Sequence, residues 1–251
     1  MPLIQCIDVQ NVTWKSVSLS SPYDLPHLPQ NTIHVWRIAV SETQLPKSKF
    51  KTILSQPELA KAEKFNRSKD RLQFITAKSF LKILLARYIN TTPEQVQFSE
   101  ELNGKPILQM EFPVSIEFNL SHAMEMILIA LSHSKVGIDV EYIDRHLDFK
   151  QLIPHIFSTP ECHFLGDSNN MINDFYSLWT RKEALVKATG LGISEQLTSI
   201  PCLGGPHQVS ANIIGSTKDW KVETVKMEGG YLASIAGDPK DDTISFYQAE
   251  L

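Results

Sequence analysis

Cysteine is scarce in this sequence, and its few copies form no recognisable pattern. The 251 residues include three cysteines, Cys6, Cys162 and Cys202, which are far apart and odd in number. Neither a disulfide framework nor a cysteine-based metal site follows from such spacing, so a reducing compartment fits best. We therefore expect a cytoplasmic protein.

Long hydrophobic runs are also missing. The longest is MILIAL, at residues 126–131, which is far too short to span a bilayer. The opening stretch MPLIQCIDVQN has no charged segment followed by an apolar one, so we expect no signal peptide. These absences argue against a membrane protein.

Positive charge is not in excess over the whole chain. The formal net charge is −4 at pH 7, which argues against a general nucleic-acid binder. Residues 47–87 nevertheless carry eleven lysines and arginines against three acidic residues. A basic segment in an acidic protein indicates an anionic ligand, although composition alone favours a solvated helix face.

Two stretches of the chain repeat one order of elements. Each half is expected to contain a strand, a helix that begins at Ser-x-Pro-Glu, a long helix and further strands. The expected elements are a strand at 33–40, helices from Ser55 and over 68–89, and short strands near 96–98, 106–110, 115–122 and 125–132 in the first half, and a strand at 136–141, helices from Ser158 and over 174–190, and strands near 209–214, 220–226 and 231–236 in the second. The first thirty residues show little periodicity and are expected to be extended.

The spacing between the two copies is nearly constant. Ser55 and Ser158 are 103 residues apart, as are Trp36 and Asp139, while Lys78 and Lys182 are 104 apart. We infer an α+β fold of two similar halves, residues 1–133 and 134–251, related by internal duplication and a pseudo-two-fold axis. The alternative is two unrelated domains that share a helix-start motif by chance.

The stretch VGIDVEY, at residues 136–142, places two carboxylates on one face of a strand. Asp139 and Glu141 are two residues apart and point away from the apolar face. Their repulsion is tolerated either at a solvent-facing edge or beside a bound cation. The first copy has Trp36 and Ile38 at these positions, so the acidic pair indicates one site rather than a shared requirement of folding.

A third carboxylate, Glu183, lies in WTRKEALVK on the long second helix. It shares a helix face with Lys187, which suits either a surface ion pair or a common site. If this helix lies on the strand, Asp139, Glu141 and Glu183 converge. Three oxygen ligands without histidine or cysteine suit Mg²⁺, and nearby lysines suit phosphates, as in phosphoryl transfer.

The ordered motifs FNLSH, GIDVEY and FYSLWTRKEALVKATGLG, preceded by GKP and accompanied by FSTPE, resemble the Sfp-type 4′-phosphopantetheinyl transferases. The resemblance runs from about Lys61 to Ala236. It implies the pseudo-dimeric fold of that family and a monomer. The implied reaction moves the 4′-phosphopantetheine arm of coenzyme A to a serine of an apo carrier protein and releases adenosine 3′,5′-bisphosphate.

The resemblance also implies roles for individual residues. Asp139, Glu141 and Glu183 would hold Mg²⁺, and Lys187, with Lys182 beside it, would contact the pyrophosphate. The serine proton would pass to Glu183 directly or through a metal-bound water, with Glu161 as the other candidate base. The residues implied for coenzyme A in the cleft between the halves are Lys105 and Pro106 near adenine and ribose, Ser121 and His122 at the 3′-phosphate, and the basic Lys61 and Lys69. Many relatives have Arg or Thr where Gln73 and Phe74 stand, so this part of the 3′-phosphate contact is expected to differ.

The sequence is also compatible with other functions and with several carrier partners. A non-catalytic module that binds coenzyme A or a carrier is one alternative, and another Mg²⁺ phosphotransferase or pyrophosphatase is a second, although P-loop and kinase motifs are absent. The carrier could be an acyl carrier protein of fatty-acid synthesis or a carrier domain of a polyketide or peptide synthetase. We expect it to dock on residues 145–173, where an apolar patch would be rimmed by positive charge; the alternative is that the apolar residues are core, because their helical spacing fits burial equally well. The segment mixes basic Arg145, His146, Lys150 and His155 with apolar Leu147, Phe149, Leu152, Ile153, Ile156 and Phe157.

Overall fold

The fold is known from a computed structural model of the chain. It describes residues 1–10, 12–19, 25–40, 50, 52–100, 104–109, 115–192 and 197–250. Part of the basic segment, residues 47–49 and 51, and the end of the expected strand at 106–110 lie outside the described residues.

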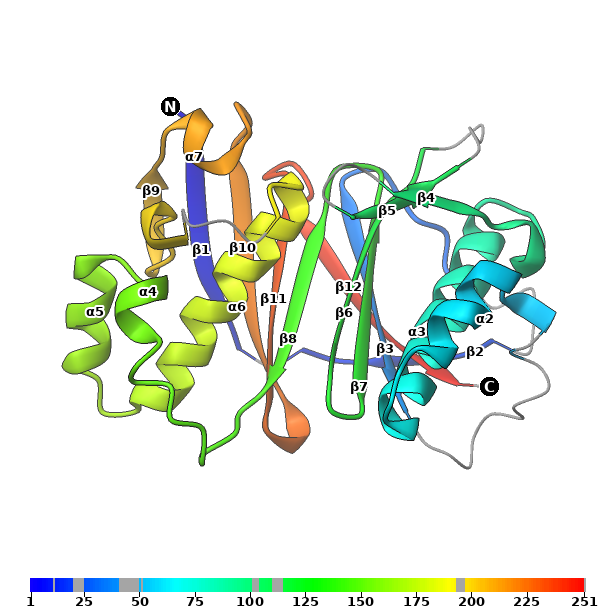
Figure 1. Cartoon of the computed structure of the whole chain (residues 1–251). Coiled ribbons are helices and arrows are strands. Elements are labelled where there is room, and N and C mark those ends of the chain that lie inside the picture. Colours follow the sequence, from blue (N-terminus) through cyan, green and yellow to red (C-terminus); the bar gives the residue numbers. More distant parts are fainter. Residues whose placement is uncertain are drawn as a thin grey trace.

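Two five-stranded sheets form the centre of the molecule (Figure 1). The first has the order β2 (Lys15–Ser18), β12 (Thr243–Glu250), β3 (Thr32–Ala39), β7 (Met126–Ser132), β6 (Glu117–Ala123). The second has the order β8 (Gly137–Tyr142), β11 (Tyr231–Gly237), β10 (Trp220–Met227), β1 (Leu3–Val9), β9 (Gly205–Gln208). A short pair, β4 (Phe98–Glu100) and β5 (Pro106–Leu108), stands apart from them.

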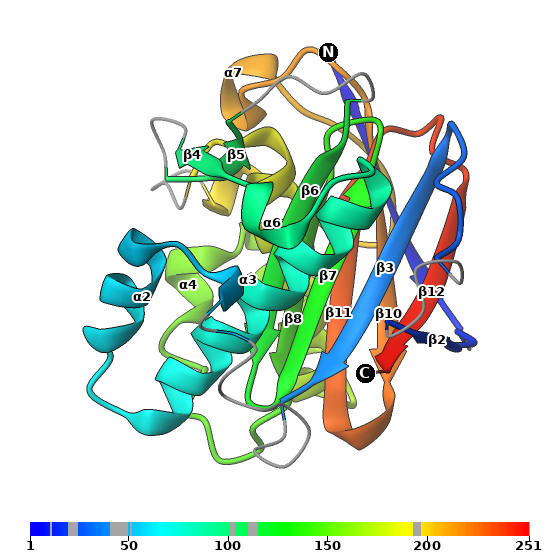
Figure 2. The ribbon, with the colours of Figure 1, turned by 90° about the vertical axis from the view of Figure 1, so that its right-hand side faces the viewer.

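The long helices lie on the outer faces of the two sheets, and the sheets are stacked between them (Figure 1). The helices are α2 (Gln56–Glu63), α3 (Ser68–Tyr88), α4 (Ile153–Ile156), α5 (Thr159–Gly166), α6 (Met171–Thr189) and α7 (Ala211–Ile214), with 3₁₀ turns at Pro93–Gln95, Leu197–Ser199 and Glu228–Gly230. The long helix α3 packs on the first sheet, and α6 packs on the second; Figure 2 shows α3 in front of the first sheet. In the described part of the chain no helix combines the length and the apolar character needed to cross a membrane.

The two halves repeat each other, which confirms the predicted α+β duplication. In the first half β3, α3, β6 and β7 follow in order, and the strands lie as β3–β7–β6 with antiparallel neighbours. In the second half β8, α6, β10 and β11 give the same arrangement, β8–β11–β10. Residues 209–214, expected as a strand, instead form mostly the short helix α7, which ends at Gly215 in the left-handed conformation.

The terminal strands cross between the halves. The first strand, β1, lies parallel to β10 in the second sheet, and the last, β12, lies parallel to β3 in the first. Within the first thirty residues, where only an extended segment was expected, the regular strands β1 and β2 form. Their partners lie some two hundred residues away along the chain, so local periodicity carries little sign of them.

Three apolar cores hold these layers together. One joins α6 to the second sheet, and one joins α3 to the first. The third lies between the sheets and includes Ile33 and Val35 of β3 with Ile138 and Val140 of β8. The apolar face of the VGIDVEY strand is therefore buried between the sheets, which turns its acidic face toward α6.

One buried lysine in each half shows which residues of the two long helices are equivalent. The equivalence is shifted by one helical turn from the one expected. In the second half Lys182 pairs with Glu161, and in the first half Lys82, not Lys78, makes the matching pair with Glu58. Both glutamates belong to the predicted Ser-x-Pro-Glu helix starts, which do form capping boxes. In this register Glu183 corresponds to Ile83, so the first copy still lacks the acidic residue.

Candidate active site

The carboxylate pair of β8 faces the helix α6 of the same half. Asp139 is buried, with 4% of its surface exposed, and its Oδ1 accepts a hydrogen bond from Lys187 Nζ at 2.6 Å. Ser121 of β6 donates to the same oxygen at 2.9 Å. Burial raises the pKa of Asp139, and the Lys187 ammonium opposes that shift.

The second carboxylate is held by an indole. Trp179 of α6 donates from Nε1 to Glu141 Oε1 at 3.1 Å. Burial, with the negative charge of Asp139 in addition, raises the pKa of Glu141. Because Trp179, Glu183 and Lys187 are spaced by four residues, all three lie on the α6 face turned toward β8.

Glu183 completes the acidic group. Burial, assisted by the charges of Asp139 and Glu141, raises the pKa of Glu183 to about 7. Among the described residues, no hydrogen-bond partner reaches Glu183 Oε1 or Asp139 Oδ2, although both atoms are buried. Buried polar atoms are nearly always satisfied in proteins, so these two oxygens indicate a missing charged partner.

A hard cation fits this donor set. All the donors are carboxylate oxygens, which Mg²⁺ prefers, and neither histidine nor cysteine is among them. The described residues include no cluster of three or more His, Cys, Asp or Glu side chains arranged closely enough to hold a metal ion as they stand. The magnesium site therefore stays a proposal.

The site lies where the two halves meet. The strands β6 and β8 belong to different sheets, and side chains join them in place of a backbone ladder. Asn119 Oδ1 accepts from the N–H of Ile138 at 2.9 Å, and Ser121 Oγ accepts from the N–H of Val140 at 3.3 Å. Sequence reasoning gave Asn119 no role. The alternation of Asn119 and Ser121 in FNLSH is the signal that could have found it.

Ser121 approaches the carboxylates from the first half, and His122, which is exposed, follows it on β6. Lys187 Nζ lies 3.1 Å from Ser121 Oγ, so these two residues and Asp139 form one cluster. Desolvation, with the nearby Lys187 ammonium, lowers the pKa of His122. Gln73 of α3 donates to the carbonyl of Met124 at the β6–β7 turn, at 2.8 Å, which ties the long first helix to this end of β6.

Two other predicted residues line a separate cavity in the first half. Lys61 and Pro106 border it together with Phe74 and Lys78, and its volume is about 490 Å³. Lys105 directly precedes β5 and is half-buried, while Lys69 is exposed in the first turn of α3. These residues lie in the first half, apart from the group around Asp139.

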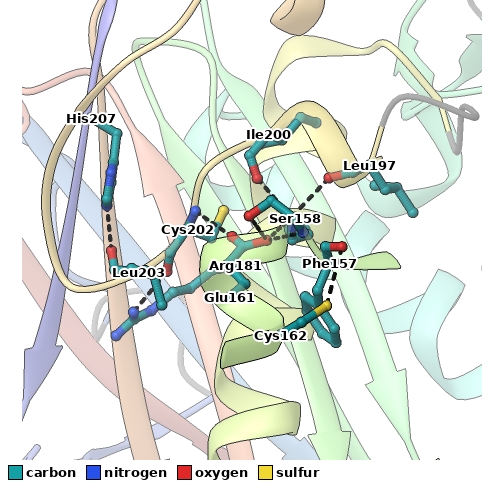
Figure 3. Close-up of polar contacts among 11 residues, drawn as sticks. Phe157, Ser158, Glu161, Cys162, Arg181, Leu197, Ile200, Cys202, Leu203 and His207 are labelled. Carbon is teal, nitrogen blue, oxygen red and sulfur yellow. Dashed lines mark hydrogen bonds and ion pairs between the residues drawn. The ribbon is translucent and has the colours of Figure 1, made fainter. Parts of the chain in front are cut away.

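Lys182 and Glu161 do not join the site. Lys182 is fully buried and donates to Glu161 Oε2, to Leu197 O and to Ile200 O, at 2.7–2.8 Å. Glu161 also accepts from Ser158 and from the N–H of Cys202 (Figure 3). Lys182 and Glu161 thus bond to each other and to neighbouring groups inside the protein. This arrangement does not fit the expected pyrophosphate contact of Lys182 or the alternative base role of Glu161.

The expected docking segment, residues 145–173, divides into core and surface. Its apolar residues Phe149, Ile156 and Phe157 are buried in the core between α6 and the second sheet, so they do not belong to a docking patch. Leu147 and Leu152 are exposed at 41% and 42%. The basic residues Arg145, His146, Lys150 and His155, near them in sequence, are also exposed.

Comparison with known proteins agrees with this architecture. Residues 135–236 match the family model of the 4′-phosphopantetheinyl transferase superfamily, and residues 42–134 match that of the 4′-phosphopantetheinyl transferase N-terminal region. The chain is 34% identical to the 4′-phosphopantetheinyl transferase HetI of Nostoc sp. over 187 residues, which cover 73% of this chain and 77% of the relative. It is 24% identical to the 4′-phosphopantetheinyl transferase Sfp of Bacillus subtilis over 213 residues, covering 82% and 93% of the two chains.

The chain belongs to the 4′-phosphopantetheinyl transferase superfamily. It is an enzyme of that class, and the predicted resemblance to the Sfp type is confirmed at the level of the family.

Proposed function

We propose that this enzyme transfers the 4′-phosphopantetheine arm of coenzyme A to a serine of an apo carrier protein. The serine oxygen forms a bond to the β-phosphorus, and the bond from that phosphorus to the bridging oxygen breaks. Adenosine 3′,5′-bisphosphate leaves with the bridging oxygen, and the serine proton passes to a base of the enzyme. The products are the holo-carrier and adenosine 3′,5′-bisphosphate.

The observation that carries this proposal is the pair of buried carboxylate oxygens without partners, Asp139 Oδ2 and Glu183 Oε1, beside the Lys187 ammonium. Asp139, Glu141 and Glu183 would hold Mg²⁺, which when bound would neutralise charge on the pyrophosphate.

Lys187 would contact the pyrophosphate, and Glu183 would accept the serine proton. The side chain of Lys187 is 28% exposed, so its ammonium can contact a phosphate oxygen while it stays beside Asp139. Glu183 Oε1 is buried beside Asp139 without a hydrogen-bond partner among the described residues, so this oxygen could accept a proton at the site. We propose Glu183 as the base that takes the serine proton, directly or through a water molecule, and not Glu161, whose oxygens are already occupied by four donors.

Coenzyme A would lie across the junction of the halves. Ser121 and His122 of β6 would contact its 3′-phosphate. Lys105 and Pro106 would adjoin the adenine and ribose, with Lys61 and Lys69 adding positive charge. What supports this placement is the cavity that Lys61 and Pro106 share. Gln73 is hydrogen-bonded to the β6–β7 turn, so it would not contact the 3′-phosphate, and basic residues would bind that group instead.

The acceptor would be an acyl carrier protein or a carrier domain of a polyketide or peptide synthetase. We infer that the enzyme acts as a monomer, because its two halves already supply both sides of the site. We also infer a cytoplasmic location, which the three free cysteines support.

Mass spectrometry of an apo carrier protein incubated with coenzyme A and Mg²⁺ tests the proposal. We expect a phosphopantetheine adduct with the wild type and none with Asp139→Ala or Glu183→Ala. Asp242→Ala, which removes an exposed carboxylate in the turn before β12, should retain activity. Binding of coenzyme A or carrier without an adduct would support a binding module, and phosphate release without an adduct would support another phosphotransferase or pyrophosphatase.

A further inference from the structure

The ammonium of Lys182 has all of its hydrogen-bonding capacity used inside the protein. A lysine ammonium has three donors, and Glu161 Oε2, Leu197 O and Ile200 O accept them at 2.8, 2.8 and 2.7 Å. The side chain has no exposed surface. Lys182 could therefore reach a substrate only by breaking a buried ion pair.

Glu161 is the centre of this network. Its Oε2 also accepts from the N–H and Oγ of Ser158, at 2.8 and 2.9 Å, and its Oε1 accepts from the N–H of Cys202 at 2.8 Å. Figure 3 shows Glu161 among Ser158, Cys202 and the carbonyls of Leu197 and Ile200. The carboxylate thus connects the start of α5, the middle of α6 and the segment that follows α6.

The first half contains the same arrangement without the acidic site. Lys82 is 1% exposed, pairs with Glu58 at 2.8 Å and donates to the carbonyl of Ile53 at 3.2 Å. Glu58 accepts from the N–H of Ser55, as Glu161 does from Ser158. The residue after Lys82 is Ile83, where the second half has Glu183. A pair that is present in both copies cannot owe its presence to a metal or substrate bound in only one of them.

We propose that Lys182 and Glu161 are positioning residues that fix the rotation of α6. Neighbouring helix residues point about 100° apart, so anchoring Lys182 on one face sets the direction of Glu183 and Lys187 on the next. The proposal rests on the proposed function, since it assigns the chemistry to Glu183 and Lys187. It removes Lys182 from the groups that touch coenzyme A.

Four variants test this role. Lys182→Met removes one charge, and Glu161→Gln removes the other while it keeps a side chain able to form a capping box. The double variant removes both charges and leaves no buried ion without a partner. Lys82→Met is the matched change in the first half. The measurements are the Tm, calorimetric binding of coenzyme A with Mg²⁺, and kcat and KM on a carrier protein.

We expect Lys182→Met to lower the Tm by roughly 10 °C, because it leaves Glu161 as an unpaired buried charge. Its kcat should fall roughly 10- to 100-fold, as for groups that orient reacting residues, while the KM for coenzyme A stays within about twofold. Lys82→Met should lower the Tm similarly. Because Lys82 also lines the cavity that Lys61 and Pro106 share, only its kcat at saturating coenzyme A is the control, and this should stay within about threefold of wild type.

The double variant decides between positioning and direct contact. If Lys182 acts through Glu161, Glu161→Gln with Lys182→Met should recover at least half of the lost Tm and raise kcat about fivefold or more over Lys182→Met. A double variant that regains the Tm but keeps the kcat of Lys182→Met would overturn the proposal, as would a coenzyme A affinity reduced roughly tenfold in both. If Lys182→Met does not fold, Glu161→Gln and the double variant make the same comparison. A wild type that transfers nothing would overturn only the proposed function, because the Tm and binding measurements test the pair without turnover.

Discussion

Gly137 of β8 lies directly against the backbone of Ala184 in α6. A Cβ atom at Gly137 would overlap the carbonyl oxygen of Ala184 and the nitrogen of Ala188, and would stand 2.9 Å from the Ala188 Cα. Only glycine allows the helix to approach the strand so closely. That approach brings Lys187 of α6 to within 2.6 Å of Asp139 on β8.

Gly137→Ala should therefore damage both the fold and the site. The contacted atoms are backbone, so the helix has to move away from β8, and overpacking of this kind costs about 1–3 kcal/mol. We expect a lower free energy of unfolding in a urea titration and a loss of transfer of about 100-fold or more, because a displacement near 1 Å has that effect on reacting groups.

Gly166→Ala is the control for that change. Gly166 ends α5, and a Cβ there would meet no atom within 4 Å. Its stability and turnover should stay near those of the wild type. A Gly137→Ala variant as active and stable as Gly166→Ala would show that the close approach is not required.

The second prediction concerns the pH dependence of stability. Glu183 has a pKa of about 7 in the folded protein, above its ordinary value of 4.5. The folded state therefore holds this proton more tightly, and the stability that it contributes is complete below about pH 4.5 and is lost as pH rises through 7. The loss is roughly 3 kcal/mol for the 6% exposed side chain, at 1.36 kcal/mol per pKa unit.

Glu183→Gln removes this titration. Relative to wild type, the variant should gain stability as the pH rises from 5 to 8 in urea unfolding of metal-free protein, because its neutral amide no longer repels Asp139 and Glu141. Addition of Mg²⁺ at pH 8 should raise the Tm of wild type more than that of Glu183→Gln. Parallel stability curves for the two proteins between pH 5 and 8 would contradict the raised pKa.

Coenzyme A binding should draw on both halves of the chain. Lys61→Ala and Lys105→Ala should mainly raise the KM for coenzyme A, since these residues lie in the first half and away from Asp139. Lys187→Ala should lower kcat as well, because its ammonium adjoins the reacting phosphates in the proposed site.

Dephospho-coenzyme A, which lacks the 3′-phosphate, separates the contributions of these residues. A lysine at that phosphate should weaken coenzyme A binding when it is removed and leave binding of dephospho-coenzyme A unchanged. If wild type and Lys61→Ala discriminate between the two donors equally well, Lys61 has no contact with the 3′-phosphate.

The sequence was sufficient to predict the duplication and the carboxylate face, because both depend on local patterns. The Ser-x-Pro-Glu starts specify helix caps, and the alternation in VGIDVEY specifies which face of β8 is acidic. Asp139 and Glu141 follow from that alternation, and Glu183 joins them by helical spacing once α6 lies on β8.

What could not be predicted depends on contacts between distant parts of the chain. The strand β1 forms beside β10 of the other half, and nothing in its own seven residues indicates that partner. Helix register was also ambiguous, because Lys78 and Lys82 both lie on α3 and only the ion pair with Glu58 identifies the counterpart of Lys182. The fully buried state of Lys182 was missed because a lysine is rarely buried without a partner, and its partner lies 21 residues away.

The last prediction concerns the surface that receives the carrier protein. Its serine has to reach the site beside Asp139, so the docking surface has to adjoin β8 and α6. The segment that joins these elements exposes Leu147 and Leu152, with Arg145 and Lys150 nearby in sequence and also exposed. Exposed apolar side chains with a basic rim suit a weak contact with an acidic helix.

Arg145→Glu should raise the KM for the carrier about tenfold at low salt and change the KM for coenzyme A much less, because rim charges act mainly on encounter. Lys218→Glu, an equal charge reversal near α7 and outside residues 145–173, is the control and should leave both values near wild type. The carrier KM of the wild type should also rise with ionic strength, since exposed charges are screened. If Arg145→Glu and Lys218→Glu give the same carrier KM at low ionic strength, the carrier docks on another face of the enzyme.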